Sequence, residues 1–291
     1  MRTSQLRAFD AVARAGSFTQ AAVQLRVTQP AVTVQVRALE EAYGLRLLSR
    51  GSGAARLTAD GQDLFVLTRQ LFAAEEAIEA RLSSGRDLEQ GSLLLAADGP
   101  HMALALLARF RSRYPGLETK VTLGNAQETR AAIQEQRADV AVLANPPKDP
   151  RMKVLPIARQ DMVVLLPRGH RWRGRKEIDL AELVEEPTVL REPGSNTRRT
   201  LDRALQKRRL RLQNALELGS REAVREAVAA GLGLGFIFSG EAIGDKRVVA
   251  LPIAGLRGSS LDCLVCLKSQ LKRRIVTALV DVAAEESPFA P

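Results

Sequence analysis

The chain has 291 residues, a length that suits two or three domains of ordinary size better than one. Hydrophobic residues make up 45% of it, which is ample for a buried core, and no apolar run approaches the roughly 18 residues of a membrane-spanning helix. The N-terminal stretch MRTSQLRAFDAVARAGS is not continuously apolar, so we predict no secretory signal and a cytosolic, cytoplasmic location.

The formal net charge of +10 favours polyanionic partners such as nucleic acid. The distribution of that charge weakens the argument. Residues 1–60 hold 8 Arg and 4 acidic residues, whereas the chain beyond residue 90 holds 32 Lys/Arg and 23 Asp/Glu. Most of the excess positive charge therefore lies outside the first sixty residues, and charge alone does not establish DNA binding.

The only cysteines, Cys263 and Cys266, form a C-x-x-C pair that is compatible with a redox motif or with half of a metal site. Their surroundings, LDCLVCLK, indicate a buried strand, on which residues three apart point to opposite faces. No second ligand pair and no thioredoxin-like turn is nearby. We therefore interpret both as core residues and predict neither a metal site nor a cofactor.

The first sixty residues predict three short helices. The first runs over 4–15 and stops at Gly16, and Ser17 is a suitable N-cap for the second. A short turn at Arg26-Val27 follows, after which Thr28 caps a third helix. Two helices joined by a tight turn, with polar side chains at the start of the last helix, are typical of a helix-turn-helix.

The third helix has one apolar face, formed by Val32, Val36 and Leu39. Pro30 is tolerated in its first turn because the backbone N–H at that position would have no partner within the helix. The side chains left for solvent or DNA are Gln29, Thr33, Gln35 and Arg37.

After Gly44, two short apolar pieces flank a Gly/Ser-rich tip and predict a small β-hairpin, the wing of a winged helix-turn-helix. Thr58 begins a long helix that extends to about Ser83. Its apolar positions, spaced by three or four residues, are Leu64, Leu67, Leu71, Ala74, Ile78 and Leu82. This stripe predicts dimerisation through a partner helix, the alternative being that it packs on its own domain. Residues 83–92 are polar and contain glycine, as expected of a hinge.

Beyond the hinge, strands alternate with helices, a pattern that indicates parallel α/β sheets in two lobes. A ligand would bind between the lobes, at the carboxyl ends of the strands. We therefore predict three parts: a winged helix-turn-helix domain over 1–60, a linker helix and hinge over 58–90, and an effector-binding domain over 91–291. Lobe I is expected over about 91–162 and 265–291, and lobe II over about 163–264.

A specific set of residues in the N-terminal part carries a family resemblance. They are Leu6–Phe9, Gly16–Ala22, Leu25, Thr28–Thr33, Val36, Leu39-Glu40, Gly44, Leu57-Thr58 and Gly61. In the C-terminal part the matching stretches are 191–198, 222–223 and 229–233. With these residues the chain resembles the LysR-type transcriptional regulators over essentially its whole length. The stretches LAADGPH, LGNAQE, DVAVLA and REPGSNTRR are also similar to regulators associated with aminoethylphosphonate catabolism.

Two departures from the family pattern stand out. Leu48 replaces a phenylalanine that is usual in the family, a change that a core tolerates at modest cost. The wing tip, 51–55, reads Gly-Ser-Gly-Ala-Ala where basic residues are usual, so Arg50 and Arg56 are the only cations expected to act in the wing.

The resemblance implies a winged helix-turn-helix followed by a two-lobed, periplasmic-binding-protein-like α/β domain. It also assigns roles in DNA binding to Thr28, Gln29, Pro30, Thr33, Gln35, Arg37 and Arg50. Gln29 can pair with an adenine edge and Thr33 can contact a thymine methyl group, while Thr28, Arg37 and Arg50 suit phosphates. For Gln35, an ordinary surface role is an equal alternative.

The expected effector site combines two loop-to-helix junctions. Residues Gly194, Ser195, Asn196 and Thr197 precede or begin a helix, where free backbone N–H groups favour an anion, and Arg198 or Arg199 would add charge. In the first lobe, Asp98 would pair with an amino group, and His101 lies beside it. An aminophosphonate or a similar zwitterion fits this arrangement. Alternatively, Ser195 and Thr197 are ordinary helix caps and His101 is a surface residue.

The basic run over 198–211 is compatible with a second nucleic-acid surface, although a solvated helix face is the simpler interpretation. An enzyme is disfavoured, since the chain has two histidines and none of the common nucleophile, zinc or phosphate-loop motifs. A transport protein is disfavoured because it would need a signal peptide and would leave residues 1–60 without a role. The partners implied by the family are promoter DNA, a small effector, RNA polymerase, and further copies of the chain in a dimer or tetramer.

Overall fold

The computed structural model describes residues 1–50, 55–82, 91–242, 244–285 and 287. The contacts divide the chain into two compact units: the first holds Met1–Asp87 together with Gln134–Arg137 and Ser269–Arg274, and the second holds the remainder. Each unit is described separately below. In the described part of the chain, no helix is both long enough and apolar enough to cross a membrane.

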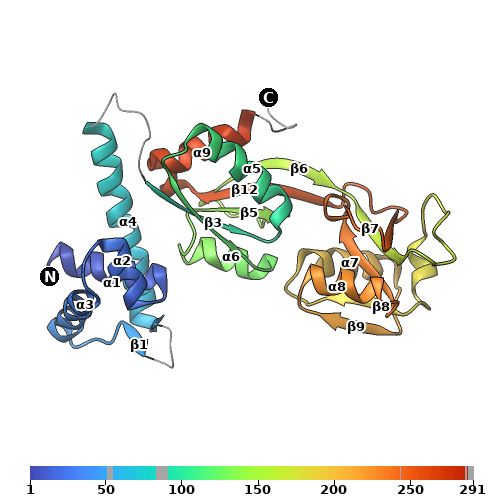
Figure 1. Ribbon diagram of the computed structural model, residues 1–291, viewed down its shortest axis with the longest axis horizontal. Helices are drawn as coiled ribbons and strands as arrows, with labels where there is room; N and C mark the ends of the chain where they lie inside the picture. The colour runs from blue at the N-terminus through green and yellow to red at the C-terminus, as the bar shows by residue number, and fades with distance from the viewer. Residues whose placement is uncertain (51–54, 83–90, 243, 286, 288–291) are drawn as a thin grey trace. The chain divides into compact units, whose positions relative to one another are not determined.

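The first unit is a helix-turn-helix with a two-stranded wing and a long final helix (Figure 1). Its elements are α1 (Thr3–Ala15), α2 (Phe18–Leu25), α3 (Gln29–Tyr43), β1 (Leu48–Arg50), β2 (Ala55–Leu57) and α4 (Ala59–Leu82). The wing strands pair antiparallel, with Leu48 opposite Leu57. The predicted three helices, wing hairpin and long helix are thus all present, while the wing tip and the hinge fall largely outside the described residues.

Local sequence signals explain where these helices begin and end. Gly16 ends α1 with a φ of 63°, a left-handed conformation that costs glycine little. The Ser17 hydroxyl accepts a hydrogen bond from the Gln20 N–H and so caps α2. Thr28 occupies the N-cap position of α3 as predicted, but its side chain makes no capping hydrogen bond. Its backbone carbonyl instead accepts from the Val32 N–H, which is the ordinary first bond of the helix.

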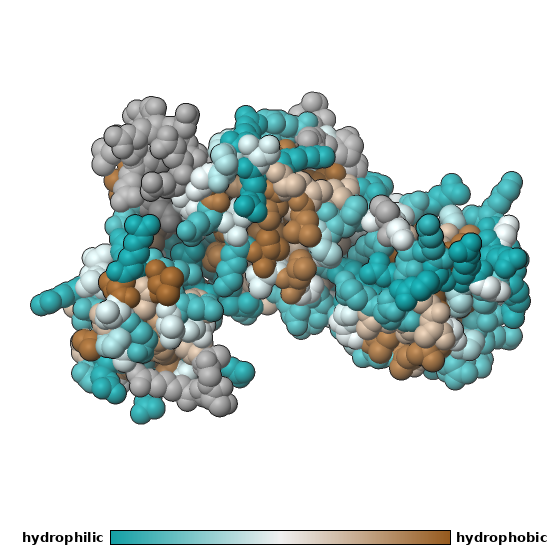
Figure 2. Space-filling model, viewed as in Figure 1, coloured by the Kyte–Doolittle hydropathy of each residue, from teal (hydrophilic) through white to brown (hydrophobic). Residues whose placement is uncertain are grey.

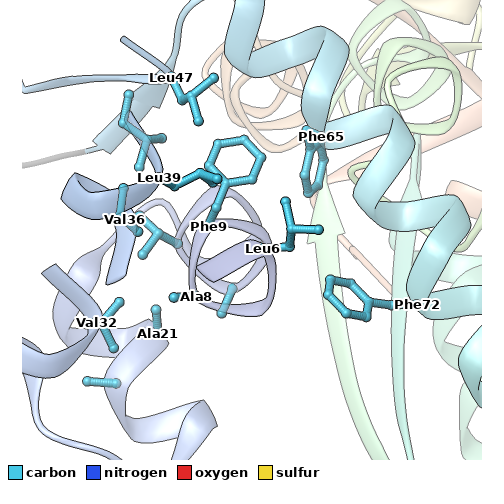
Figure 3. Packing of buried hydrophobic residues seen from close by; sticks show 14 residues of the cluster. Leu6, Ala8, Phe9, Ala21, Val32, Val36, Leu39, Leu47, Phe65 and Phe72 are labelled. Atoms are coloured by element: carbon cyan, nitrogen blue, oxygen red, sulfur yellow. The ribbon is translucent and has the colours of Figure 1, made fainter. Parts of the chain in front are cut away.

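The core of this unit lies between α1, α3 and α4 (Figure 3). Phe9 of α1 and Phe65 of α4 are fully buried, and Val36 and Leu39 of α3 complete the same cluster. Hydrophobic burial of this kind contributes more than any other interaction to the stability of a small domain. The predicted buried face of α3 is therefore confirmed.

The start of α4 is hydrogen-bonded to the segment that precedes strand β1 of the wing. The Thr58 hydroxyl donates to the Arg46 carbonyl at 2.6 Å, and the Thr58 N–H donates to the Leu47 carbonyl at 3.0 Å. At Gly61, a Cβ atom would lie 2.0 Å from that same Leu47 oxygen. Thr58 thus binds the backbone at Arg46 and Leu47, and because Gly61 has no side chain, the first turn of α4 can lie directly against the Leu47 carbonyl.

The second unit consists of two lobes, each built on a five-stranded sheet. The sheet of lobe I has the order β4-β3-β5-β12-β6. Its strands are β3 (Ser92–Ala97), β4 (Glu118–Leu123), β5 (Val140–Ala144), β6 (Met152–Gln160) and β12 (Ser260–Leu267), and its helices are α5 (Pro100–Arg113), α6 (Ala126–Gln134) and α9 (Arg274–Glu285). Figure 1 shows α6 on one side of this sheet, with α5 and α9 on the other.

The sheet of lobe II has the order β11-β7-β10-β8-β9. Its strands are β7 (Met162–Pro167), β8 (Thr188–Arg191), β9 (Ala215–Leu218), β10 (Leu234–Phe238) and β11 (Val248–Pro252), and its helices are α7 (Asn196–Arg208) and α8 (Arg221–Ala229). Alternate residues of β7 face opposite ways: Val164 packs in the cluster that includes Leu201 of α7, and Leu165 packs with Val224 of α8.

The short helical turns η1 (Leu180–Leu183) and η2 (Ser239–Glu241) occur in the connections of this unit, and η3 (Lys268–Lys272) lies between β12 and α9 in the sequence.

The structure corrects the expectation of purely parallel sheets. Strand β12 pairs antiparallel with β5 and β6, and β7 pairs antiparallel with β10 and β11. Strands β7 and β12 are the ones that enter each lobe from the other, so no crossover helix precedes them and they are free to run antiparallel. Because β12 begins at Ser260, lobe II ends near 259, about five residues before the boundary at 264 that the sequence predicted.

Strands β6 and β11 were absent from the sequence-based prediction. Strand β6 contains Pro156 and lies at the sheet edge, beside an irregularity in its pairing with β12. Proline is tolerated at such edge positions because its missing N–H leaves no buried acceptor unpaired. By contrast, the strand predicted around Cys263 and Cys266 is confirmed, and both thiols are buried in it. Burial raises the pKa of Cys263 to about 12 and that of Cys266 to about 11, which disfavours reactive thiolates.

Candidate DNA-binding face and effector cleft

The start of α3 presents a polar face. Thr28, Gln29 and Pro30 are exposed, and Thr33 is half-buried one turn further along the helix. The Gln29 side-chain amide donates to the Thr33 hydroxyl at 2.8 Å. This bond leaves the Gln29 side-chain oxygen and one N–H available, so the two residues form a single hydrogen-bonding surface of the kind that reads base edges in a major groove.

The other predicted DNA contacts lie in different surroundings. The Gln35 oxygen accepts a hydrogen bond from the Ser4 hydroxyl of α1 at 3.3 Å, which favours the alternative that Gln35 has an ordinary surface role. Arg37 is exposed on α3 and suits a phosphate contact. Arg50 ends strand β1, at the base of the wing. Arg56, its neighbour on β2, is exposed.

Val34 is a residue of this face that the sequence analysis missed. It follows Pro30 by one helical turn and is 62% exposed, although α3 otherwise buries its valines. An apolar side chain at this place can contact a thymine methyl group. The available signal was the helical spacing, because Val34 falls outside the face defined by Val32, Val36 and Leu39.

Glu40 connects the recognition helix to the wing. One of its carboxylate oxygens accepts hydrogen bonds from the backbone N–H groups of Leu47 and Leu48, at 2.8 and 3.1 Å. Leu39 beside it is buried in the core. The Leu39-Glu40 pair noted in the sequence thus fixes the position of β1 relative to α3.

In the second unit, a polar cluster lies at the carboxyl ends of strands from both lobes. Asp98 follows β3, and its carboxylate accepts from the Ala144 N–H at the end of β5, at 3.0 Å. Arg221, the first residue of α8 in lobe II, donates to the Asp98 backbone carbonyl. The same guanidinium pairs with Glu241 at 2.5 Å. Arg221 therefore joins the two lobes directly.

Further hydrogen bonds cross between the lobes around this cluster. The Asn145 side-chain amide donates to the Asn196 side-chain oxygen at 3.2 Å, and the Gly240 N–H donates to the Gln160 side-chain oxygen at 3.0 Å. Gln160 also donates to Asp262. The lobes are thus connected by hydrogen bonds between uncharged amide and backbone groups, in addition to the contacts of Arg221.

Two spaces open on this cluster. The inner one measures about 20 Å³, room for one water molecule, and its lining includes Asp98, Asn196 and Asp262. The outer one measures about 380 Å³, a size that suits a small ligand. The two spaces share His101, Arg221 and Glu241. The outer space is further lined by Pro100, Leu104, Leu165, Glu222, Arg225, Ile237 and Gly240.

The predicted effector residues separate into two groups. Asp98, His101 and Asn196 line these spaces, whereas Gly194, Ser195, Thr197 and Arg198 line neither. Ser195 is buried, and its hydroxyl accepts from the Arg198 N–H at 3.0 Å, as expected of the helix-cap alternative. Thr197 is buried as well.

Arg198 is directed away from the spaces between the lobes, toward carboxylates of its own lobe. Its guanidinium binds Asp202 and Glu217, each at 3.0 Å.

Arg221, Arg225 and Glu241 are site residues that sequence reasoning missed. Arg221 and Glu222 directly follow Ser220, whose hydroxyl caps α8 by accepting from the Ala223 N–H at 3.1 Å. The serine-capped helix was visible in the sequence. Its position opposite Asp98 depends on the crossover of β7 and β12 between lobes, which local patterns do not reveal.

Burial gives Asp98 an unusual proton affinity. Desolvation raises the pKa of Asp98 from 3.8 to about 6, against the opposing hydrogen bond from Ala144 and the attraction of Arg221. Burial likewise raises the pKa of Asp262. In the folded domain Asp98 thus holds its proton more tightly than in the unfolded chain, so the stability it contributes is complete below about pH 4 and is lost as the pH rises through about 6.

Replacing Asp98 with asparagine should remove this dependence. We expect the free energy of unfolding of the variant minus that of wild type to rise by up to about 3 kcal/mol between about pH 4 and pH 7. Urea unfolding followed by the fluorescence of Trp172, which packs against the lobe II core, measures that difference at each pH. A difference that stays constant over this range would contradict the elevated pKa.

Together these features define a class of protein. A winged helix-turn-helix with a polar recognition helix is joined to a two-lobed domain whose cleft is lined by charged groups, which is the architecture of an effector-controlled DNA-binding regulator.

Comparison of the chain with models of known protein families identifies the family within this class. Residues 3–62 match the bacterial regulatory helix-turn-helix protein, lysR family, and residues 86–288 match the LysR substrate binding domain. The chain belongs to the LysR family of DNA-binding transcriptional regulators, which confirms the resemblance drawn from its sequence.

Individual relatives agree with this assignment. The RuBisCO operon transcriptional regulator of Allochromatium vinosum is 33% identical over 80% of this chain and 78% of its own. The structure of a full-length OxyR variant from Pseudomonas aeruginosa shares the fold with a TM-score of 0.79, at 21% identity over 97% of this chain and 94% of that one. The Synechocystis CcmR regulatory domain in complex with 2-PG has a TM-score of 0.63 and 25% identity, over 69% of this chain and all of that one.

Proposed function

We propose that the effector of this regulator is a small anion or zwitterion that binds in the outer space between the lobes. The observation that carries the proposal is the pair of guanidinium groups, Arg221 and Arg225, that α8 presents to that space. They lie four residues apart, so they fall on the same side of the helix. His101 faces them from lobe I.

The carboxylates of the cluster supply the opposite charge. Glu241 lines both spaces, and Asp98 lines the inner one. A ligand with an acidic group toward Arg225 and an amino group toward Glu241 would satisfy both charges at once. An aminophosphonate has this chemistry, as the finer sequence resemblance also implies. The CcmR regulatory domain, described in complex with 2-PG, supports ligand binding by a domain of this fold.

Ser195 and Thr197 have a smaller part in this proposal than the sequence suggested. Their hydroxyls are buried, so we assign them to the stability of α7 and assign the contacts with the effector to His101, Arg221 and Arg225, which line the outer space.

Dimerisation through α4 is the second element of the proposal. Leu67, Leu71 and Ile78 of the predicted stripe are 60%, 46% and 60% exposed, while Phe65 and Phe72 on the opposite side are buried in the core. Leu64 at the start of the stripe packs against the helix-turn-helix core, but these three residues do not, and an apolar helical face of this kind is stabilised by a partner helix. A dimer would present two recognition helices to the two halves of an operator.

Lobe I offers another apolar surface, visible in Figure 2. The exposed residues Leu104 of α5 and Leu123 of β4 belong to this lobe. Such patches are typical of interfaces between subunits, and we propose that they serve a tetramer built from two dimers. Such an assembly would act on promoter DNA in the cytosol and would place RNA polymerase within reach.

The coupling of effector to DNA follows from Arg221. Its guanidinium connects the lobes through the Asp98 carbonyl and Glu241, and it also faces the outer space. An anion there would compete with Glu241 for this guanidinium and so alter the bonding between the lobes. A ligand shifts the regulator only to the extent that it binds one lobe arrangement better than the other.

Calorimetric titration of the full chain tests the effector proposal. We expect saturable binding of 2-aminoethylphosphonate that exceeds binding of phosphate, sulfate and acetate, and we expect it to weaken at least about tenfold in Arg225→Gln because a charge-assisted hydrogen bond is lost. Arg173→Gln, in an exposed loop of lobe II, is the control with the same change of charge. Equal affinities in the two variants, or no binding by any of the four compounds, would refute the anionic effector at this place.

A further inference from the structure

We infer that a second binding site, for a doubly charged tetrahedral oxyanion such as a phosphate or phosphonate group, lies where α6 of lobe I meets α7 of lobe II. Its residues are Arg130, Arg199 and Arg203. The site is distinct from the outer space on α8 described above, and nothing in the proposed effector binding requires it.

The backbone brings the beginnings of the two helices together. The Gln127 N–H, in the first turn of α6, donates to the Gly194 carbonyl just before α7, at 3.2 Å. At Gly194, a Cβ atom would lie 2.8 Å from the side-chain nitrogen of Asn125, so the two loops are in close contact. Arg130 and Arg199 each lie about one helical turn beyond this contact, and Arg203 follows Arg199 by a further turn.

The electrostatics agree with this placement. Burial lowers the pKa of Arg199, and the neighbouring charges of Arg203 and Arg130 lower it further, with Asp98 opposing them. Arg203 of the same helix and Arg130 of lobe I are therefore both near enough to Arg199 to repel its charge.

Among the described residues, no carboxylate pairs with this cluster: Arg130, Arg199 and Arg203 form no ion pair and no side-chain hydrogen bond there. Other arginines of α7 behave differently, since Arg198 binds Asp202 and Glu217, and Arg208 binds Asp179. The basic run noted in the sequence thus contains arginines with carboxylate partners, Arg198 and Arg208, and arginines without one among the described residues, Arg199 and Arg203.

The chemistry of the cluster selects the class of ligand. Three guanidinium groups present several N–H donors in fixed planes, which match the oxygens of a phosphate or phosphonate and offset its two charges. A carboxylate has one charge and two oxygens and satisfies the cluster less well. Because the groups come from both lobes, a bound oxyanion would favour the arrangement in which α6 and α7 adjoin.

Thermal unfolding and calorimetry of the full chain test the inference, with inorganic phosphate and methylphosphonate as probes and acetate as the monovalent comparison, all at constant ionic strength. We expect both tetrahedral probes to raise the Tm of wild type and acetate to leave it nearly unchanged. In Arg199→Gln/Arg203→Gln the phosphate affinity should fall at least about tenfold. The Tm without a probe should stay the same or rise, because a repulsion has been removed. Arg203→Gln alone, a single change on the surface side of α7, repeats the test where folding is not at risk.

Two control variants separate the possible failures. Arg209→Gln/Arg211→Gln carries the same loss of charge outside the cluster and should bind phosphate as wild type does, while Arg225→Gln affects only the outer space. If the 209/211 variant lost as much phosphate affinity as the 199/203 variant, phosphate would be held by the overall positive charge and not at a specific site. If only Arg225→Gln lost phosphate affinity, the phosphate would bind in the outer space on α8. Either result would refute the inference. If the 199/203 variant lost affinity for duplex DNA but kept its affinity for phosphate, the cluster would be a DNA-backbone contact and the inference would be wrong.

Discussion

Replacing Gly61 with alanine should unfold the helix-turn-helix domain under conditions in which the wild-type domain is stable. A Cβ atom at this position would lie 2.0 Å from the Leu47 backbone oxygen and 2.9 Å from its carbonyl carbon. Neither atom belongs to a flexible side chain, so the start of α4 must move away and lose the Thr58 bonds to Arg46 and Leu47. We expect a loss of about 3 kcal/mol or more in the free energy of unfolding, the upper range for overpacking.

Urea unfolding followed by far-ultraviolet circular dichroism measures this loss, because the first unit is mostly helical. Gly16→Ala is a graded comparison: the space around Gly16 is open, but its φ is 63°, so the left-handed conformation alone should cost about 1–2 kcal/mol. A Gly61→Ala variant no less stable than Gly16→Ala would show that the close approach of α4 to Leu47 is not required.

Replacing Gln29 with alanine should reduce sequence preference much more than total affinity for DNA. Gln29 is exposed at the start of α3 and shares a hydrogen bond with Thr33, so it is arranged to read a base edge. A bidentate pair with a base is worth about 1–3 kcal/mol of discrimination, which corresponds to a loss of about 5- to 150-fold in the ratio of specific to non-specific affinity. Fluorescence anisotropy with an operator duplex and a scrambled duplex measures that ratio.

Arg37→Gln is the matched comparison on the same helix. Its guanidinium is exposed and suits a phosphate, so its loss should weaken binding to both duplexes by a similar factor and reduce the dependence on salt. A Gln29→Ala variant that keeps the wild-type ratio would show that base reading lies elsewhere on α3, with Thr33 and Val34 the next residues to test.

The N-terminal domain could be predicted from sequence in some detail because its signals are local. Gly16, Ser17 and the Arg26 turn act on their own backbone, and the apolar spacing of α3 gives its buried face directly. The exposure of Leu67, Leu71 and Ile78 on α4 also agrees with the spacing that predicted the stripe. What local patterns omitted was Val34, since exposure of a valine is decided by how the three helices pack.

The effector domain was predictable as alternating strands and helices but less so as a site. The edge strands β6 and β11 were missed, and the antiparallel strands were assigned as parallel, because both features depend on the paired crossover between lobes. Ser195 looked like an anion ligand and is buried as a cap, since the same hydroxyl at a helix start serves either purpose. Arg221 was overlooked because its contact with Asp98 joins residues 123 positions apart in the chain.

The measurement that tests the account most directly is selection of DNA by the purified full chain from a pool of randomised duplexes, followed by sequencing. A dimeric regulator with an exposed Gln29-Thr33 face on each α3 should enrich a motif with two related half-sites, separated by about one helical turn or a multiple of it. Enrichment of no motif, with equal binding to all duplexes, would contradict sequence-specific recognition by α3.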